Sequence, residues 1–207
     1  MLNIIKKEEP NFFQEFKNKY SPRNWGEYQN IQKENNINIK EELKKYMLLN
    51  EQNFSCCYCE KTINKNTSHI EHIKSKSKFP KEFQDYTNLV VSCMSNTSCG
   101  HYKDEKGKTK YPNYYNKFIN PVIENPECYF CYDLKTGELI LKDGIKKEMK
   151  EKGKLTIGVL NLNEKSLVSA RKKYLFNLMN CIEQPETFEF FTEFPTMVKF
   201  LKDEFNV

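Results

Sequence analysis

The sequence contains little glycine, a single tryptophan and no long apolar run. Its seven glycines form neither a phosphate-binding P-loop nor a dinucleotide-binding fingerprint, which excludes the nucleotide-binding enzymes that depend on these loops. No stretch approaches the roughly 18 apolar residues of a membrane-spanning helix. The first residues, MLNIIKKEEP, also lack the apolar segment of a secretory signal. We therefore expect a cytoplasmic protein with no membrane partner.

The overall composition is that of a folded protein with a slight positive charge. Hydrophobic residues make up 38% of the 207 residues, enough to form a core. The net charge of +5 permits a polyanionic partner without requiring one. Eight cysteines in a chain without a secretory signal indicate a reducing compartment, where clustered thiols bind metal more often than they form disulfides.

Helical periodicity marks the N-terminal part of the chain. Aromatic residues recur at helical spacing over residues 11–20, directly after Pro10, and proline suits the start of a helix. Residues 40–49 repeat the apolar spacing and predict a second helix. The polar stretch between them, rich in Asn and Gln, is expected to be a loop.

The remaining chain changes character twice. After residue 54 the helical period disappears, and residues 88–93 predict a short strand. Residues 128–142 predict a β-hairpin around a turn that contains Gly137.

A second helical region follows the hairpin. Asn163 is predicted to cap a long helix with an apolar face, and the Phe-rich tail over 187–205, interrupted by Pro195, predicts one or two short helices. The expected fold is therefore α+β, with N- and C-terminal helices around a small cysteine- and histidine-rich centre. The expected parts of one compact domain are an N-terminal helical region (1–52), the centre (53–110), and a hairpin with a C-terminal helical region (111–207).

Two cysteine pairs in the centre predict a structural zinc site. Cys56 and Cys59 form a C-x2-C pair, and Cys93 and Cys99 form a second, wider pair. Two thiolate pairs brought together make a closed tetrahedral zinc site, which stabilises a segment too small to bury its own core. Cys57 is disfavoured as a ligand because it leaves only one residue before Cys59.

Cys128 and Cys131 form a rival C-x2-C pair. They fall in the predicted hairpin, where residues i and i+3 of a strand point to opposite faces. We therefore interpret them as packing residues, since free cysteine behaves as a small hydrophobe.

All three histidines lie in the same region as the zinc pairs, in the order His69, Glu71-His72, Asn88 and His101. Hydrolysis of a phosphodiester needs an activated water and a cation at the phosphate. One histidine can take the proton of the water, a carboxylate and an imidazole can hold a divalent ion, and an asparagine can fix the histidine loop. No single one of these residues indicates a site for phosphodiester hydrolysis, but the ordered set together with the four cysteines does.

These motifs resemble the HNH (ββα-metal) nuclease family, in the segments CCYCEKTI, IEHIKSKSKFP, YTNLVVSC and SCGHYK. The lead-in KEELKKYMLLNEQNFSCCYCE and the later segment TIGVLNLNEKSLVSARKKY are similar to the PtuB-type HNH proteins, which accompany an ATPase in Septu antiphage systems and in some retrons. The resemblance covers about residues 1–180. It implies a small zinc-stabilised ββα-metal core.

The resemblance implies a role for each matched residue. His72 would be the general base, Asn88 the residue that orients the histidine loop, and Glu71 a ligand of a catalytic Mg2+ or Mn2+ ion. His101 would be a further catalytic ligand. Many members place a His or Asn directly after the last cysteine, whereas here Gly100 stands in that position, and a local bulge would have to bring in His101. His69 has no fixed role in the pattern and is expected to be exposed or a weak phosphate contact.

The expected function is metal-dependent cleavage of nucleic acid, with DNA favoured over RNA, by a defence nuclease that works with a PtuA-like ATPase in a hetero-oligomeric complex. Two other hypotheses stay open: a zinc-stabilised module that binds nucleic acid or protein without cleavage, and a structural zinc adaptor. Five lysines near the site either contact phosphates or form a solvated face: Lys74, Lys76, Lys78, Lys103 and Lys106.

Overall fold

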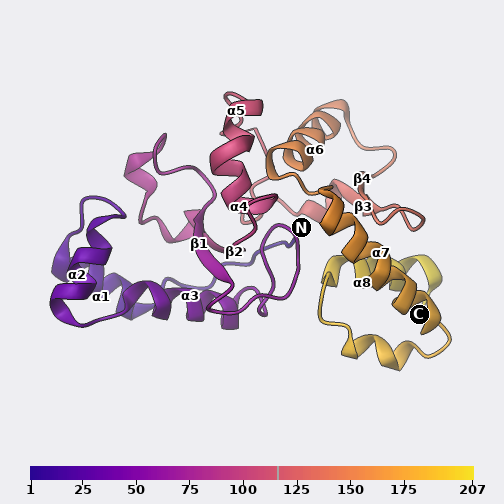
Figure 1. Cartoon of the computed structure of the whole chain (residues 1–207), viewed down its shortest axis with the longest axis horizontal. Helices are drawn as coiled ribbons and strands as arrows, with labels where there is room; N and C mark the ends of the chain where they lie inside the picture. The colour runs from indigo at the N-terminus through magenta and orange to yellow at the C-terminus, as the bar shows by residue number, and fades with distance from the viewer. Residues whose placement is uncertain (116) are drawn as a thin grey trace.

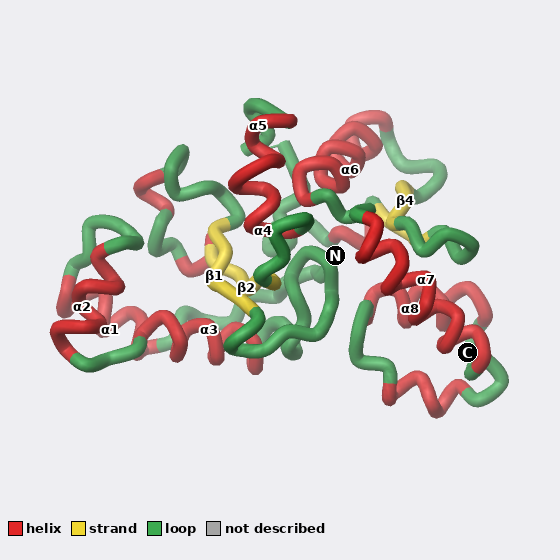
Figure 2. The backbone as a smooth tube through the Cα atoms, viewed as in Figure 1, coloured by secondary structure: helices red, strands yellow, loops and turns green. Residues whose placement is uncertain are grey.

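The computed structural model describes residues 1–115 and 117–207. Their helices and strands confirm a mixed α+β fold with two separate two-stranded antiparallel sheets (Figures 1 and 2). The elements are α1 (Asn11–Tyr20), α2 (Glu27–Asn35), α3 (Ile39–Asn50), β1 (Ser68–His72), β2 (Leu89–Cys93), α4 (Cys99–Tyr102), α5 (Lys108–Lys110), β3 (Phe130–Tyr132), β4 (Leu139–Leu141), α6 (Lys147–Leu160), α7 (Lys165–Asn180) and α8 (Pro195–Phe205). No helix within the described residues is both long and apolar enough to cross a membrane.

The central hairpin places the histidine motif beside the predicted strand. β1 pairs with β2 in a register that sets Glu71 opposite Val90 and His72 opposite Leu89. The valines of β2 are fully buried, so β2 forms the floor of this part of the core. A continuous helical segment then runs through α4, a π-helical turn (Lys103–Gly107) and α5. Contacts of α4 with β2 give a β–β–α arrangement.

The N-terminal helices lie on one side of the hairpin in Figure 1. The predicted helices over 11–20 and 40–49 are confirmed as α1 and α3, but the predicted loop between them is wrong, because α2 forms there. Asn24 accepts hydrogen bonds from the backbone of the first turn of α2. Tyr28 is fully buried and packs against Phe16 and Trp25. One anchored aromatic residue and an N-terminal cap thus make a helix of a polar sequence.

The C-terminal elements lie on the other side of the hairpin in Figure 1. The predicted β-hairpin is confirmed as β3 and β4. The predicted cap of the long helix is wrong by one residue: Glu164 accepts from the backbone at the start of α7. Asn163 instead exchanges two hydrogen bonds with the backbone of Leu139 and accepts one from Arg171, which ties α7 to β4.

Helix α6, which was not predicted, fills the space between this hairpin and the centre; it contacts both α4 and β4. The tail forms the predicted short helices, a 3-10 helix (Pro185–Phe190) and α8. The buried residues form one continuous core cluster from Met1 to Leu201. The division of the chain at residues 52 and 110 stays a prediction.

Candidate functional site

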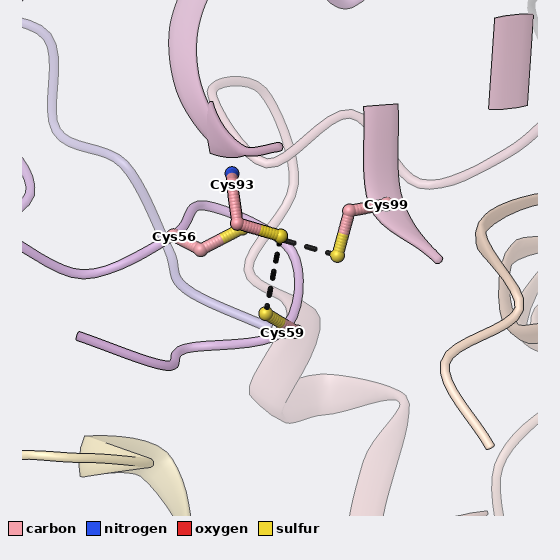
Figure 3. Close-up of side chains that lie close together, drawn as sticks. All are labelled: Cys56, Cys59, Cys93 and Cys99. Atoms are coloured by element: carbon pink, nitrogen blue, oxygen red, sulfur yellow. Dashed lines mark hydrogen bonds between the residues drawn. The ribbon is translucent and has the colours of Figure 1, made fainter. Parts of the chain in front are cut away.

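The four cysteines predicted to bind zinc come together at one point, with their sulfur atoms turned toward one another (Figure 3). All four Sγ atoms lie within 4.8 Å of one another, and the pairs Cys56–Cys99 and Cys59–Cys93 are 3.9 Å apart. Sulfurs about 2.3 Å from one tetrahedral zinc ion lie about 3.8 Å apart. The cluster could therefore hold a structural metal ion such as zinc.

The surroundings of Cys56 favour the ionised form of its thiol. Burial opposes its ionisation, but hydrogen bonds from neighbouring thiols, Cys57 first among them, hold the pKa of Cys56 well below its ordinary value. The backbone N–H of Cys93 also donates to Cys56 Sγ over 3.3 Å. A donor-rich environment of this kind favours the ionised, metal-binding form.

The other cysteines stay outside the cluster, and among the described residues it is the single group of its kind. Cys57 is buried beside it and is not a member, as predicted. Cys131 is half-buried in β3, which fits a packing role, whereas Cys128 is exposed in the turn before the strand. The packing interpretation is therefore wrong for Cys128, because the strand begins only at Phe130.

Glu71 is buried with its two carboxylate oxygens in different surroundings. Oε1 accepts from Lys103 Nζ at 2.7 Å and from the Tyr58 hydroxyl at 3.3 Å. Oε2 faces Nε2 of His69 at 3.3 Å. Burial raises the pKa of this carboxyl, but the Lys103 ammonium and the contact with His69 outweigh it and lower the pKa of Glu71 to about 2. Glu71 is thus a carboxylate at neutral pH, with one oxygen anchored.

His72 is buried at the end of β1 and is held in one orientation. Its Nε2 lies 2.9 Å from the backbone oxygen of Phe83, and its ring is perpendicular to that of Trp25 with centroids 4.8 Å apart. Because a carbonyl oxygen only accepts, Nε2 carries the proton, and Nδ1 is the basic nitrogen of the neutral ring. Burial lowers the pKa of His72 to about 4, against the opposing effect of the Phe83 carbonyl. The imidazole is therefore neutral at neutral pH, with a free lone pair on Nδ1.

Asn88 directly precedes β2 and connects the two ends of the loop between β1 and β2. Its Oδ1 accepts from the backbone N–H of Lys74 at 2.8 Å, and its Nδ2 donates to the backbone oxygens of Lys74 and Glu82, each at 3.1 Å. The backbone N–H of Ile73, next to His72, donates to the backbone oxygen of Asn88 at 3.0 Å. These bonds give Asn88 the geometry of a residue that orients the histidine loop.

His101 lies beside His69. The two rings stack with centroids 4.1 Å apart, and His101 Nδ1 lies 3.3 Å from Asn96 Oδ1. His69 is half-buried against Glu71, so the expectation of an exposed His69 is wrong, whereas a weak phosphate contact stays a prediction. The reason is strand geometry: residues two apart on β1 point to the same face.

The five lysines near the site differ in what they can contact. The ammonium of Lys103 is fully buried and donates to the backbone oxygens of His72 and Ile73 as well as to Glu71, so it is not a phosphate contact. Lys74 pairs with Glu82 at 2.8 Å. The remaining three are exposed: Lys76, Lys78 and Lys106. Trp25 is a site residue that the sequence did not assign. Lys103 was expected at the surface or on phosphate, because the local sequence pattern does not show that a lysine is buried.

Comparison with known proteins gives one informative relative. The chain is 29% identical, over 217 aligned positions that cover 89% of this chain and 83% of the relative, to an Escherichia coli protein named "Retron Ec83 putative HNH endonuclease". No protein-family model matches the chain. The similarity over most of both chains, together with the β–β–α centre and the four-cysteine cluster, supports an HNH-type nuclease with an α+β fold.

Proposed function

We propose that the protein is a metal-dependent HNH endonuclease that hydrolyses phosphodiester bonds of nucleic acid. One observation carries this proposal: the Glu71-His72 pair ends β1 of an antiparallel hairpin, and the next helix, α4, packs over the Glu71 carboxylate. The relative named as an HNH endonuclease supports it. The retained site residues are His72, Glu71, Asn88 and His101.

His72 is the proposed general base. With Nε2 bonded to Phe83, Nδ1 takes a proton from water while the water oxygen forms its bond to phosphorus and the bond to the leaving oxygen breaks. Asn88 is a positioning residue, because its hydrogen bonds to the backbone of Lys74 fix the chain directly after His72. Trp25 and the Phe83 carbonyl keep the ring in one orientation.

The residues beside His72 fit a hard divalent ion, Mg2+ or Mn2+. Glu71 is a buried carboxylate with one oxygen free of protein donors other than His69. An imidazole of the His69–His101 stack would be the second ligand; the sequence pattern assigns His101 to this position. Such an ion supplies positive charge at the phosphate and at the leaving oxygen.

We further propose DNA as the substrate and antiphage defence as the context, with a PtuA-like ATPase as the partner and zinc in the four-cysteine cluster. The name of the relative, which places it in a retron, supports the defence context. The resemblance of the flanking segments to PtuB-type proteins supports the ATPase partner. Exposed Lys76 and Lys78, in the loop after His72, could contact backbone phosphates without sequence preference.

A module that binds nucleic acid without cleaving it is the second candidate. The burial of His72 favours it, because its side chain is only 3% exposed under Trp25 and water must reach Nδ1. This candidate predicts bound zinc and bound nucleic acid with no cleavage at any concentration of Mg2+ or Mn2+.

The two candidates are separated by wild-type protein and His72→Ala, both with measured zinc content. Each is incubated with plasmid DNA and with total RNA, in Mg2+ and in Mn2+, with and without the ATPase. Cleavage by the wild type alone supports the nuclease and identifies the substrate. Equal results for both proteins, with zinc intact and the ATPase present, contradict the proposal.

A further inference from the structure

Gly100, in the first turn of α4, lets the backbone pass directly over the carboxylate of Glu71. A Cβ built at position 100 would lie 2.5 Å from Oε2 of Glu71 and 3.1 Å from Nε2 of His69. A side chain at this position would have to displace Oε2. The absence of a side chain therefore lets α4 pack closely against the carboxylate without displacing Oε2, and His69 borders this contact.

His69 and Glu71 project from the same face of β1 because they are two residues apart in a strand. Nε2 of His69 and Oε2 of Glu71 are 3.3 Å apart. Two adjacent ligand atoms about 2.1 Å from one divalent ion lie about 3 Å apart. The spacing of the two atoms therefore fits a shared ion.

One nitrogen of the His69 ring lacks a hydrogen-bond partner among the described residues. This nitrogen, Nδ1, is buried. A buried ring nitrogen without a partner requires an explanation, such as a bound ion or a functional role. With the proton on Nδ1 instead of facing Oε2 of Glu71, Nε2 presents its lone pair to an ion shared with that oxygen.

Both candidate ligands are held in place by neighbours. Oε1 of Glu71 is anchored by Lys103, so the carboxylate turns Oε2 toward His69. The ring of His101 stacks on that of His69 at 4.1 Å, and Asn96 contacts His101 Nδ1. His101 thus covers His69 and has a polar partner of its own.

We infer that His69, together with Glu71, ligates the divalent ion of the site, and that His101 positions the His69 ring. This inference rests on the proposed function in placing a Mg2+ or Mn2+ ion at Glu71, and it assigns the imidazole ligand to a residue that the sequence pattern left without a role. The strand then supplies both ligands, and Gly100 of α4 leaves Oε2 in place beside His69.

The test measures Mn2+ binding to the zinc-loaded full chain, without nucleic acid. Free Mn2+ is counted by electron paramagnetic resonance, and spin-echo spectroscopy detects a coordinated imidazole nitrogen. We expect one bound Mn2+ with nitrogen coupling in the wild type. In His69→Ala the coupling disappears and the affinity falls by roughly tenfold or more, whereas in the matched control His101→Ala the coupling remains.

Gly100→Ala is a second variant that removes no ligand atom. Its Cβ would displace Oε2 of Glu71, so Mn2+ binding weakens while zinc content and the circular dichroism spectrum stay unchanged. It keeps the inference open to test if His69→Ala does not fold.

Three results would overturn the inference: no bound Mn2+ in the wild type, unchanged coupling and affinity in His69→Ala, or loss of the coupling in His101→Ala alone. Cleavage is scored separately. Bound Mn2+ that depends on His69 in a protein that cuts nothing, even with the ATPase, supports the inference and contradicts the proposed function. Cleavage by a protein whose Mn2+ binding does not depend on His69 supports the proposed function and contradicts the inference.

Discussion

At the residue scale, the site is organised by a buried lysine. Lys103 is fully buried and connects the Glu71 side chain to the backbone of His72. Its ammonium lies 2.7 Å from Glu71 Oε1 and donates to the backbone oxygen of His72 at 2.7 Å. Burial alone would lower the pKa of Lys103, but Glu71 and Asp104 raise it above its ordinary value. One cation therefore compensates the carboxylate and fixes the end of β1.

Replacing Lys103 should destabilise the fold rather than weaken DNA binding alone. In Lys103→Met the carboxylate of Glu71 stays buried without its partner, and removing one member of a buried pair costs about 3–5 kcal/mol. Urea unfolding at neutral pH measures the loss. Lys106→Met is the matched control, because Lys106 is exposed on the same helical segment, and its free energy of unfolding should change by less than about 0.5 kcal/mol. Equal effects of the two substitutions would contradict the structural role of Lys103.

At the scale of elements, the four-cysteine cluster joins three segments of the centre. Cys56 and Cys59 come from the loop before β1, Cys93 ends β2, and Cys99 begins α4. A metal ion bound by the cluster would therefore contribute to the folding of the whole centre.

Replacing one cluster thiol should release the metal. Cys56→Ser is expected to lose bound zinc and the cooperative thermal transition of the centre, because three thiolates cannot close the tetrahedral site. Cys128→Ser is the control, since Cys128 is exposed and outside the cluster. Zinc content by mass spectrometry and thermal denaturation read the outcome; full zinc in Cys56→Ser would contradict the assignment.

The loop between β1 and β2 depends on Asn88. Asn88→Ala removes three hydrogen bonds that close this loop, at a cost of about 1–3 kcal/mol. We expect unchanged zinc content, lower cleavage, and increased hydrogen exchange at the amides of Ile73 and Lys74. Asn66→Ala, at an exposed position, should alter none of these. Protected amides in Asn88→Ala would show that the loop is held by other contacts.

The sequence predicted those parts of the fold and site whose cause is local. The spacing after Pro10 gave α1, the turn at Gly137 gave the hairpin, and the two cysteine pairs gave the cluster. α2 was missed because its stability comes from Tyr28, whose partners lie in other segments. His69 was left without a role for a related reason: its neighbour His101 comes from a different element, and only the paired strands and α4 bring the rings together.

At the scale of the whole molecule, Glu60, next to Cys59 of the four-cysteine cluster, connects the N-terminus to the start of α8. Its buried carboxylate accepts from the backbone N–H and hydroxyl of Thr196 at 2.8 and 2.7 Å, and from the Tyr132 hydroxyl at 3.2 Å. The α-ammonium of Met1 pairs with the same carboxylate. Burial would raise the pKa of Glu60, but the Met1 ammonium and Thr196 outweigh it and hold this pKa below its ordinary value.

This arrangement predicts that acid loosens the attachment of the C-terminal helices. A carboxyl whose pKa is lower in the folded state stabilises the fold above its unfolded pKa of about 4.5 and loses that contribution as the pH falls further. In Glu60→Gln the free energy of unfolding should drop by about 3–5 kcal/mol at pH 7, because the buried Met1 ammonium loses its partner. The difference from wild type should shrink steadily below pH 4.5. Urea midpoints measured across this range check the prediction, and Glu204→Gln, at an exposed position, is the control. A difference that stays constant with pH would show that the Glu60 carboxylate does not hold the two ends of the molecule together by its charge.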